Sequence, residues 1–261
     1  QKSMKTYQGD MDKLKKKNPN ERLDHHFFRS IAHRGASGTA PENTMIAFSY
    51  AIEMGFWGIE TDIHLTSDKK WVCIHDETVD RTSSGTGTVK SKTLTQLKAL
   101  DFGSWYDPIF INQRIPTIEE FLETCKLGNV VPYIELKTGY TDVEIESLVK
   151  IIRDFDMEDS SVIISFTLTN LQKVRYYSDF LALGYVTSTF NQKVVDDTVE
   201  LGNAFLNVAK AQVTAANMQL AKDKKVQVEA WTVDTNRETR NVSKLGVRAI
   251  TTNEISYVRG Y

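Results

Sequence analysis

Short apolar runs alternate along the chain with longer stretches whose apolar residues recur every three or four positions. The runs have the length of strands, and the longer stretches have the periodicity of helices. The predicted strands are residues 31–33, a run that begins at 58, and 133–137, 162–166, 181–186, 204–208, 226–233 and 249–252. The predicted helices are 45–54, 94–100, 117–127, 142–155, 171–177, 193–201, 215–222 and 237–245. Eight strands, nearly all followed by a helix, predict a parallel sheet that closes into an α/β barrel.

Two parts of the chain depart from this alternation. Residues 77–116 form a long connection after the second predicted strand, and we expect a small insertion on the barrel rim there. Residues 1–28 contain a lysine run and little apolar sequence, so we expect a polar N-terminal arm before a single domain over 29–261. The expected architecture is a TIM (β/α)8 barrel with an insertion after strand two.

Composition narrows the class of protein. Of 261 residues, 41% are hydrophobic and 25% charged, which is typical of a globular protein with a full core. No apolar run approaches the roughly 20 residues of a membrane span, and a net charge of −2 argues against a nucleic-acid surface. Cys73 and Cys125 are too few and too far apart for a zinc module, so we expect buried free thiols. A chain that begins with Gln1 favours a processed, secreted bacterial protein over a cytoplasmic one.

The candidate chemistry begins with a pair of carboxylates. Glu60 and Asp62 lie two residues apart in a predicted strand, so their side chains leave the same face. Neighbouring carboxylates repel each other unless a cation lies between them, and oxygen ligands suit Ca2+ or Mg2+. A polar turn then returns the chain along a second short strand, which brings His75 to the same end of the pair. A salt-bridged strand end is the alternative interpretation of the carboxylates.

The carboxyl ends of the other predicted strands carry more functional groups, and active sites of α/β barrels lie at these ends. The residues placed there are His33, Arg34, Glu135, Lys137, Phe166 and Trp231. Glu135 would complete a metal site with Glu60 and Asp62. His33, which alone could be a core histidine, would form an acid–base pair with His75.

The remaining rim residues have two interpretations each. Arg34 and Lys137 either bind a phosphate group or neutralise the carboxylates. Phe166 and Trp231 are expected to line the substrate-binding pocket, although Trp231 could equally belong to the barrel core.

In this order the motifs resemble the glycerophosphodiester phosphodiesterase family. The resemblance covers roughly residues 30–256 and rests on His33-Arg34-Gly35, Pro41-Glu42-Asn43-Thr44, Glu60-x-Asp62, His75-Asp76, Glu135-Leu136-Lys137, Trp231-Thr232-Val233-Asp234 and Thr252-Asn253. Asp234 is a departure, because the family more often has Asn there. The Pro41–Thr44 motif is interpreted as a scaffold that caps a helix, with Glu42 in reach of the metal site.

The resemblance implies a TIM barrel with an insertion after strand two and a divalent metal cofactor. The implied roles are metal ligands for Glu60, Asp62 and Glu135, catalytic histidines for His33 and His75, and phosphate contacts for Arg34 and Lys137. We expect Ca2+ over Mg2+, since the ligands are all oxygen and the rim is open.

The expected activity is metal-dependent hydrolysis of a glycerophosphodiester to sn-glycerol 3-phosphate and an alcohol. Related alternatives are phosphodiesterases acting on cell-wall teichoic acid or on lysophospholipid. The latter would need an apolar rim, for which the polar segment 82–88 gives little support. A metal-independent glycosidase and a barrel that binds phosphodiesters without turnover are further alternatives, against which the two histidines argue.

Overall fold

The computed structural model describes residues 29–254, so the predicted arm over 1–28 lies outside the described part of the chain. The barrel strands are β1 (Arg29–Ala32), β2 (Gly58–Leu65), β4 (Val131–Leu136), β5 (Val162–Ser165), β6 (Ala182–Thr187), β7 (Ala204–Ala209), β8 (Val228–Trp231) and β9 (Ala249–Thr252). Neighbouring strands in this series pair in parallel, and β1 pairs with both β2 and β9. The sheet therefore closes, and the predicted TIM barrel is confirmed.

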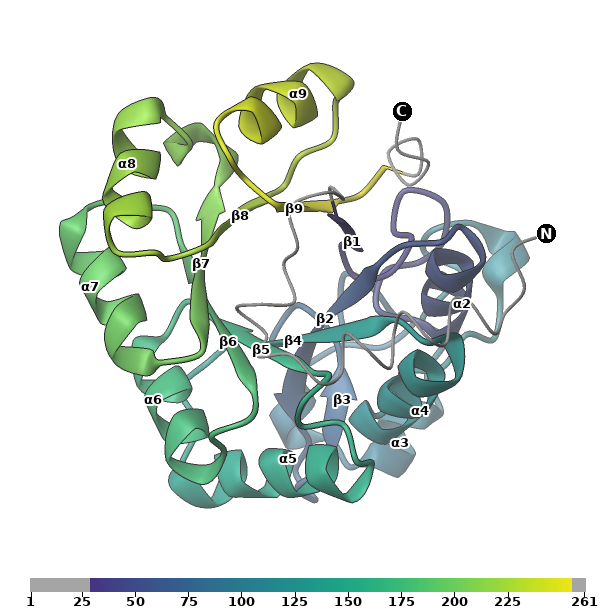
Figure 1. Ribbon diagram of the computed structural model, residues 1–261. Coiled ribbons are helices and arrows are strands. Elements are labelled where there is room, and N and C mark those ends of the chain that lie inside the picture. The colour runs from purple at the N-terminus through teal and green to yellow at the C-terminus, as the bar shows by residue number, and fades with distance from the viewer. Residues whose placement is uncertain (1–28, 255–261) are drawn as a thin grey trace.

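Helices cover the outside of the barrel (Figure 1). They are α2 (Met45–Glu53), α4 (Ile118–Gly128), α5 (Asp142–Asp154), α6 (Leu168–Tyr177), α7 (Gln192–Leu201), α8 (Ala215–Asp223) and α9 (Asn236–Lys244). The predicted boundaries hold to within a few residues. At the end of α4, however, Gly128 is still helical and Asn129, with φ 55°, terminates the helix in the left-handed conformation.

The connection after β2 contains the predicted insertion. It begins with β3 (Trp71–Cys73), which pairs antiparallel with the end of β2. It continues through η1 (Val89–Ser91), α3 (Leu94–Lys98) and η2 (Pro108–Phe110). A small core of its own, which includes Val79 and Leu97, holds these elements together. β1 pairs only with the start of β2, so the hairpin extends the sheet past the rim of the barrel.

Side-chain alternation along β2 separates the hydrophobic core from the candidate site. Ile59 and Ile63 face outwards and pack in the same buried cluster as Phe48 and Phe121 of the covering helices. Because successive side chains alternate, Glu60 and Asp62 are on the other face, toward the inside of the barrel. A separate cluster that includes Ile31, Tyr133 and Phe205 fills the interior below them.

Two further expectations concern single features. Cys73 and Cys125 are buried free thiols, as predicted. Within residues 29–254, no helix is long and apolar enough to cross a lipid bilayer.

Candidate active site

Three buried carboxylates meet where β2 and β4 run side by side. Asp62 and Glu135 are direct partners in the register of these two strands, and Glu60 lies two residues before Asp62. One oxygen from each carboxylate lies within 4.8 Å of the others. The structure therefore brings together the three residues that the sequence predicted as metal ligands.

The electrostatics of this triad favour a cation. Burial, together with the neighbouring carboxylates, raises the pKa of Glu60 well above its usual value. Burial and the charge of Asp62 raise the pKa of Glu135 to about 7. Burial also opposes ionisation of Asp62, but Arg34 and Lys137 outweigh it and lower the pKa of that carboxyl. Among the described residues, the buried Oε1 atom of Glu60 has no hydrogen-bond partner. An acidic cluster with an unpartnered buried oxygen fits a hard divalent ion.

The turn after β1 carries Arg34 in a left-handed conformation, with φ 58°. This conformation directs the backbone N–H of Arg34 to Oε2 of Glu60, at 2.8 Å. Its guanidinium donates from Nη1 to Oε1 of Glu42 at 2.9 Å, and its Nε lies 3.5 Å from Oδ2 of Asp62. Gly35 follows with φ 79°, and a Cβ atom there would lie 2.8 Å from the backbone of Ala47. The turn thus needs a glycine next to Arg34.

Lys137 reaches the triad from the end of β4. Its Nζ donates to Oε1 of Glu135 at 2.8 Å and lies 3.4 Å from Oδ1 of Asp62. These ion pairs correspond to one of the two interpretations of Arg34 and Lys137, neutralisation of the carboxylates. The side chains of both cations keep 18% of their surface exposed, so their charges lie at the mouth of the site.

The imidazole of His33 is held by the end of β9. Its Nδ1 lies 2.7 Å from Oδ1 of Asn253, while the Nδ2 of Asn253 donates to Asp234 at 3.0 Å. Because the carboxylate of Asp234 takes the amide N–H, Asn253 presents an acceptor to His33, and Nδ1 must carry the proton. Burial, aided by the charge of Arg34, lowers the pKa of His33. The neutral ring leaves Nε2 available.

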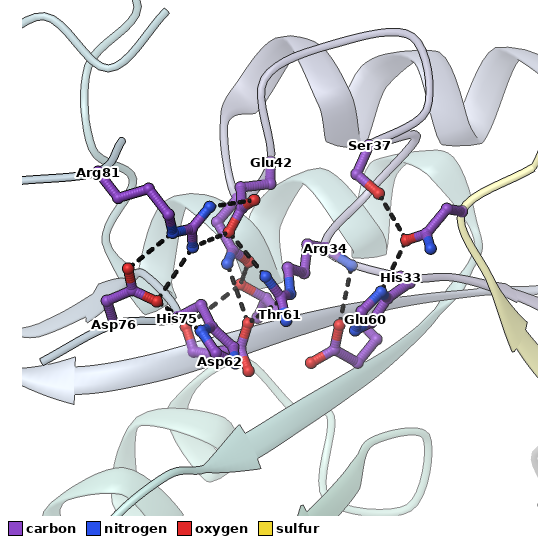
Figure 2. A network of polar contacts seen from close by, with 12 residues as sticks. His33, Arg34, Ser37, Glu42, Glu60, Thr61, Asp62, His75, Asp76 and Arg81 are labelled. Atoms are coloured by element: carbon purple, nitrogen blue, oxygen red, sulfur yellow. Dashed lines mark hydrogen bonds and ion pairs between the residues drawn. The ribbon is translucent and has the colours of Figure 1, made fainter. Parts of the chain in front are cut away.

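The second imidazole comes from the end of the hairpin. Nδ1 of His75 donates to Oδ1 of Asp76 at 2.7 Å, so Nε2 is again the available nitrogen. His64 donates from Nε2 to the backbone carbonyl of His75 at 3.0 Å. Figure 2 shows Asp62 and Glu60 lying between His75 on one side and His33 on the other.

Two aromatic residues, Phe166 and Trp231, lie at the carboxyl ends of β5 and β8. The rings of Phe166 and Trp231 make an edge-to-face contact with centroids 5.5 Å apart. Phe166 is 47% exposed. Trp231 is partly buried, packs against the interior cluster and donates from Nε1 to the backbone carbonyl of Asn207. Trp231 therefore belongs to the top of the core, while Phe166 is the more exposed side chain.

Sequence reasoning missed two contributors to the site. The Pro41–Thr44 motif caps α2 through Thr44, as interpreted, but Asn43 has a role that was not predicted. The buried amide of Asn43 instead donates to Oδ2 of Asp62 at 3.0 Å. Arg81 of the insertion contacts Glu42 and Asp76, and an arginine five residues after the His-Asp motif was its only signal.

The chain is similar in sequence to known proteins. The chain is 35% identical over 232 residues to a glycerophosphodiester phosphodiesterase of Caldanaerobacter subterraneus subsp. tengcongensis, covering 86% of this chain and 93% of the relative. It is 31% identical over 230 residues to a glycerophosphodiester phosphodiesterase of Bacillus altitudinis, covering 85% of this chain and 93% of the relative.

Solved structures share the fold. A phosphodiesterase of Oleispira antarctica, in complex with the product sn-glycerol-3-phosphate, matches with a TM-score of 0.78 and 25% identity over 86% of this chain and 92% of its own. A glycerophosphodiester phosphodiesterase of Agrobacterium tumefaciens matches with a TM-score of 0.77 and 24% identity over 88% of this chain and 97% of its own. The profile of the glycerophosphoryl diester phosphodiesterase family matches residues 33–256. The chain, with its acidic triad at the carboxyl end of a closed barrel, belongs to the glycerophosphoryl diester phosphodiesterase family.

Proposed function

We propose that this protein hydrolyses glycerophosphodiesters to sn-glycerol 3-phosphate and an alcohol, and that it needs a divalent metal ion and two histidines to do so. The observation that carries the proposal is the convergence of the buried triad with two cations and two imidazoles at one end of the barrel. The family match and the product-bound Oleispira antarctica phosphodiesterase support the substrate class.

Glu60, Asp62 and Glu135 would hold the metal ion. Ca2+ fits the all-oxygen ligand set, with Mg2+ as the alternative. A bound divalent ion would add positive charge against the phosphoryl oxygens and offset the mutual repulsion of the carboxylates.

Arg34 and Lys137 would bind the phosphate group. They lie at the mouth of the site, where Nη1 of Arg34 is 2.9 Å from Glu42 and Nζ of Lys137 is 2.8 Å from Glu135. The exposed parts of both side chains can contact the phosphate and stabilise the negative charge that develops on its oxygens.

His33 and His75 provide the two proton transfers. One imidazole, in its neutral form, accepts a proton at Nε2 from the attacking hydroxyl or water, and the other, in its protonated form, donates its Nε2 proton to the leaving alcohol. Each ring has its Nδ1 hydrogen-bonded to a fixed acceptor, so each presents Nε2 for this purpose. The attacking group could be the substrate's own glycerol hydroxyl, with water opening the resulting cyclic phosphate.

The first test measures release of sn-glycerol 3-phosphate from glycerophosphocholine, with and without EDTA, and after addition of Ca2+ or Mg2+. We expect EDTA to abolish release and Ca2+ to restore it better than Mg2+. We expect Glu60→Gln to abolish metal-dependent release, whereas Asp154→Asn, which neutralises an exposed carboxylate paired with Lys150, should leave it unchanged. Full activity in EDTA after exhaustive dialysis would contradict the metal requirement.

The same assay tests the histidines. His33→Ala and His75→Ala should each lower kcat by about 10²- to 10⁴-fold, the usual contribution of general acid–base catalysis. Circular dichroism should show that both variants keep the fold. A near-normal rate in either variant would show that the acid–base assignment is wrong.

A second candidate substrate is lysophospholipid, and one surface of the insertion favours it. The polar segment 82–88 argued against an apolar rim, but residues 105–111 expose Ile109 and Ile111 by 78% and 61%. Phe110 anchors this segment on Ala40 and Ala47, beside the turn that carries Arg34. Lysophosphatidylcholine and a teichoic acid polymer should therefore be assayed beside glycerophosphocholine, with kcat/KM deciding among them.

A further inference from the structure

Arg81 lies at the start of the insertion and joins two carboxylates from different elements. It donates from Nη1 and Nη2 to the two carboxylate oxygens of Glu42, at 2.9 and 2.8 Å. It also donates from Nε and Nη2 to the two oxygens of Asp76, at 2.7 and 3.0 Å. Figure 2 shows Arg81 lying between Asp76 and Glu42. Planar guanidinium groups suit such two-point contacts with carboxylates.

Each of these carboxylates leads to a residue of the candidate active site. Asp76 accepts the Nδ1 hydrogen of His75 at 2.7 Å. Glu42 accepts a hydrogen from Nη1 of Arg34 at 2.9 Å. Arg81 is therefore the central member of a continuous row of charged groups that joins the hairpin histidine to the arginine of the turn after β1.

The backbone that carries Arg81 is itself held in place. Val79 is fully buried, and its N–H donates to the carbonyl of Gly87 at 3.0 Å. The N–H of Gly87 in turn donates to Oδ2 of Asp80 at 2.8 Å, and Ser83 donates to the carbonyl of Val79 at 2.7 Å. The polar residues after Arg81 thus form an ordered turn, and this turn presents the guanidinium to the rim.

We propose that Arg81 is a positioning residue, which fixes the orientation of the His75 imidazole and the Arg34 guanidinium by clamping Asp76 and Glu42 together. Its effect on turnover rests on the proposed function, whereas its effect on His75 does not. The insertion, which begins directly after the His75-Asp76 motif, would thus contribute a residue that supports the candidate active site.

Most of the N–H donors of Arg81 are already used, which favours a positioning role over substrate binding. An arginine has five N–H donors, and the contacts with Glu42 and Asp76 use four of them. The two carboxylates also raise the pKa of Arg81, and Arg81 holds the pKa of Asp76 below its usual value. Asp76 therefore remains an ionised acceptor for His75, and little of the guanidinium is left for a phosphate.

Removal of the Arg81 contacts with Asp76 and Glu42 should lower kcat. Without Arg81, the side chain of Asp76 can rotate, and the ring of His75 loses its fixed partner. A displacement of about 1 Å in a catalytic group costs on the order of 100-fold in rate. We therefore expect Arg81→Met to lower kcat by about 10- to 100-fold. KM should change by less than about 3-fold, because Arg34 keeps its contacts with Asp62 and Glu60, and Lys137 contacts neither Glu42 nor Asp76.

Different substitutions of Arg81 distinguish the effect of its positive charge from the effect of its planar shape. Arg81→Lys keeps the positive charge but offers no planar fork, so it should lose most of the activity that Arg81→Met loses. Guanidinium ion at millimolar concentration should partly restore Arg81→Gly and should leave the wild type unchanged. Arg114→Met is the matched control, because Arg114 belongs to the same insertion but donates to the carbonyl of Leu100, and it should keep the wild-type kcat.

Nitrogen-15 NMR of histidine-labelled protein gives a readout that does not need turnover. In the wild type, His75 should show a single tautomer with the proton on Nδ1, and His75→Gln assigns the signal. Arg81→Met and Arg81→Lys should shift this signal toward a mixture of tautomers, whereas Arg114→Met should not.

Two results would overturn the proposal. Either an unchanged His75 signal in folded Arg81→Met, or a rise in KM with kcat preserved, would show that Arg81 does not position the histidine. If the wild type hydrolysed no glycerophosphodiester but the His75 signal responded as expected, the proposed function would fail and the positioning role would stand.

Discussion

At the scale of single residues, the acidic triad depends on a neighbour that carries no charge. Asn43 is buried with φ 53°, donates to Asp62 at 3.0 Å and accepts from the hydroxyl of Thr61 at 2.7 Å. An asparagine can do both because its amide is donor and acceptor at once and because it tolerates the left-handed conformation. Asn43 therefore orients Asp62 without adding a fourth charge.

Replacement of Asn43 by glycine removes these hydrogen bonds and keeps the backbone conformation. Asp62 then loses a donor and Thr61 loses an acceptor in a buried site, which should cost about 1–3 kcal/mol of unfolding free energy. We also expect the metal concentration for half-maximal activity to rise. Thermal melts and metal titrations of Asn43→Gly would measure both effects, with Asn129→Gly, at φ 55° in the cap of α4, as the control. Equal effects of the two substitutions would show that the amide of Asn43 has no special role.

At the scale of elements, the turn between β1 and α2 is pressed against the end of β9. The N–H of His33 donates to the carbonyl of Thr252 at 2.9 Å, and Ser37 donates to Asn253 at 3.1 Å. A Cβ atom on Gly38 would lie 2.3 Å from the carbonyl oxygen of Asn253. The close approach of these two segments is what brings the amide of Asn253 to the ring of His33.

Gly38→Ala should push the turn and the end of β9 apart. Since the clash is with backbone, the loops must shift, and the contact between His33 and Asn253 should weaken. We expect kcat to fall by about 10-fold or more with the secondary structure retained, because misplaced catalytic groups lose rate steeply. Gly139→Ala, where a Cβ would meet nothing within 4 Å, should behave as the wild type in the same kinetic assay. An active Gly38→Ala would mean that the turn adapts without disturbing His33.

At the scale of the whole molecule, the barrel interior contains a buried acid below the site. Glu229 accepts a hydrogen bond from the hydroxyl of Tyr133 at 3.1 Å and is the register partner of Asn207. Within the described part of the chain, Oε2 of Glu229 and Oδ1 of Asn207 are buried without a hydrogen-bond partner. Burial raises the pKa of Glu229 to about 7. A proton on Glu229 would let the carboxyl donate a hydrogen bond inside the barrel.

Stability should therefore fall as pH rises through this range. Between about pH 4.5 and 7 the unfolded chain ionises at this residue while the folded protein keeps the proton, so the folded state binds more protons. The loss amounts to about 3 kcal/mol when the full shift is counted. Denaturant unfolding of the metal-free protein across this range, compared with Glu229→Gln, would isolate the contribution. We expect the variant to show the shallower dependence, and parallel curves would contradict the assignment.

Local sequence pattern was enough to predict the elements and most of the candidate site. Alternation in β2 set Glu60 and Asp62 on one face, and the closing of a parallel barrel put Glu135 beside them. The helix predicted from residue 117 is α4, and Thr117 and Glu120 form a capping box at its start. These features depend on residues a few positions apart or on neighbouring strands, and such short-range rules can be applied to a sequence directly.

The supporting contacts could not be predicted in this way. The partner of His33 is 220 positions away, and Arg81 reaches Glu42 across 39 positions between two loops. Loops follow no side-chain period, so their sequence does not show which charges will meet. The sequence by itself thus determined the barrel, its insertion and the residues at the strand ends, because periodicity governs them. Only the tertiary structure decided how Asn43, Arg81 and Asn253 hold that site, because packing of distant segments sets their geometry.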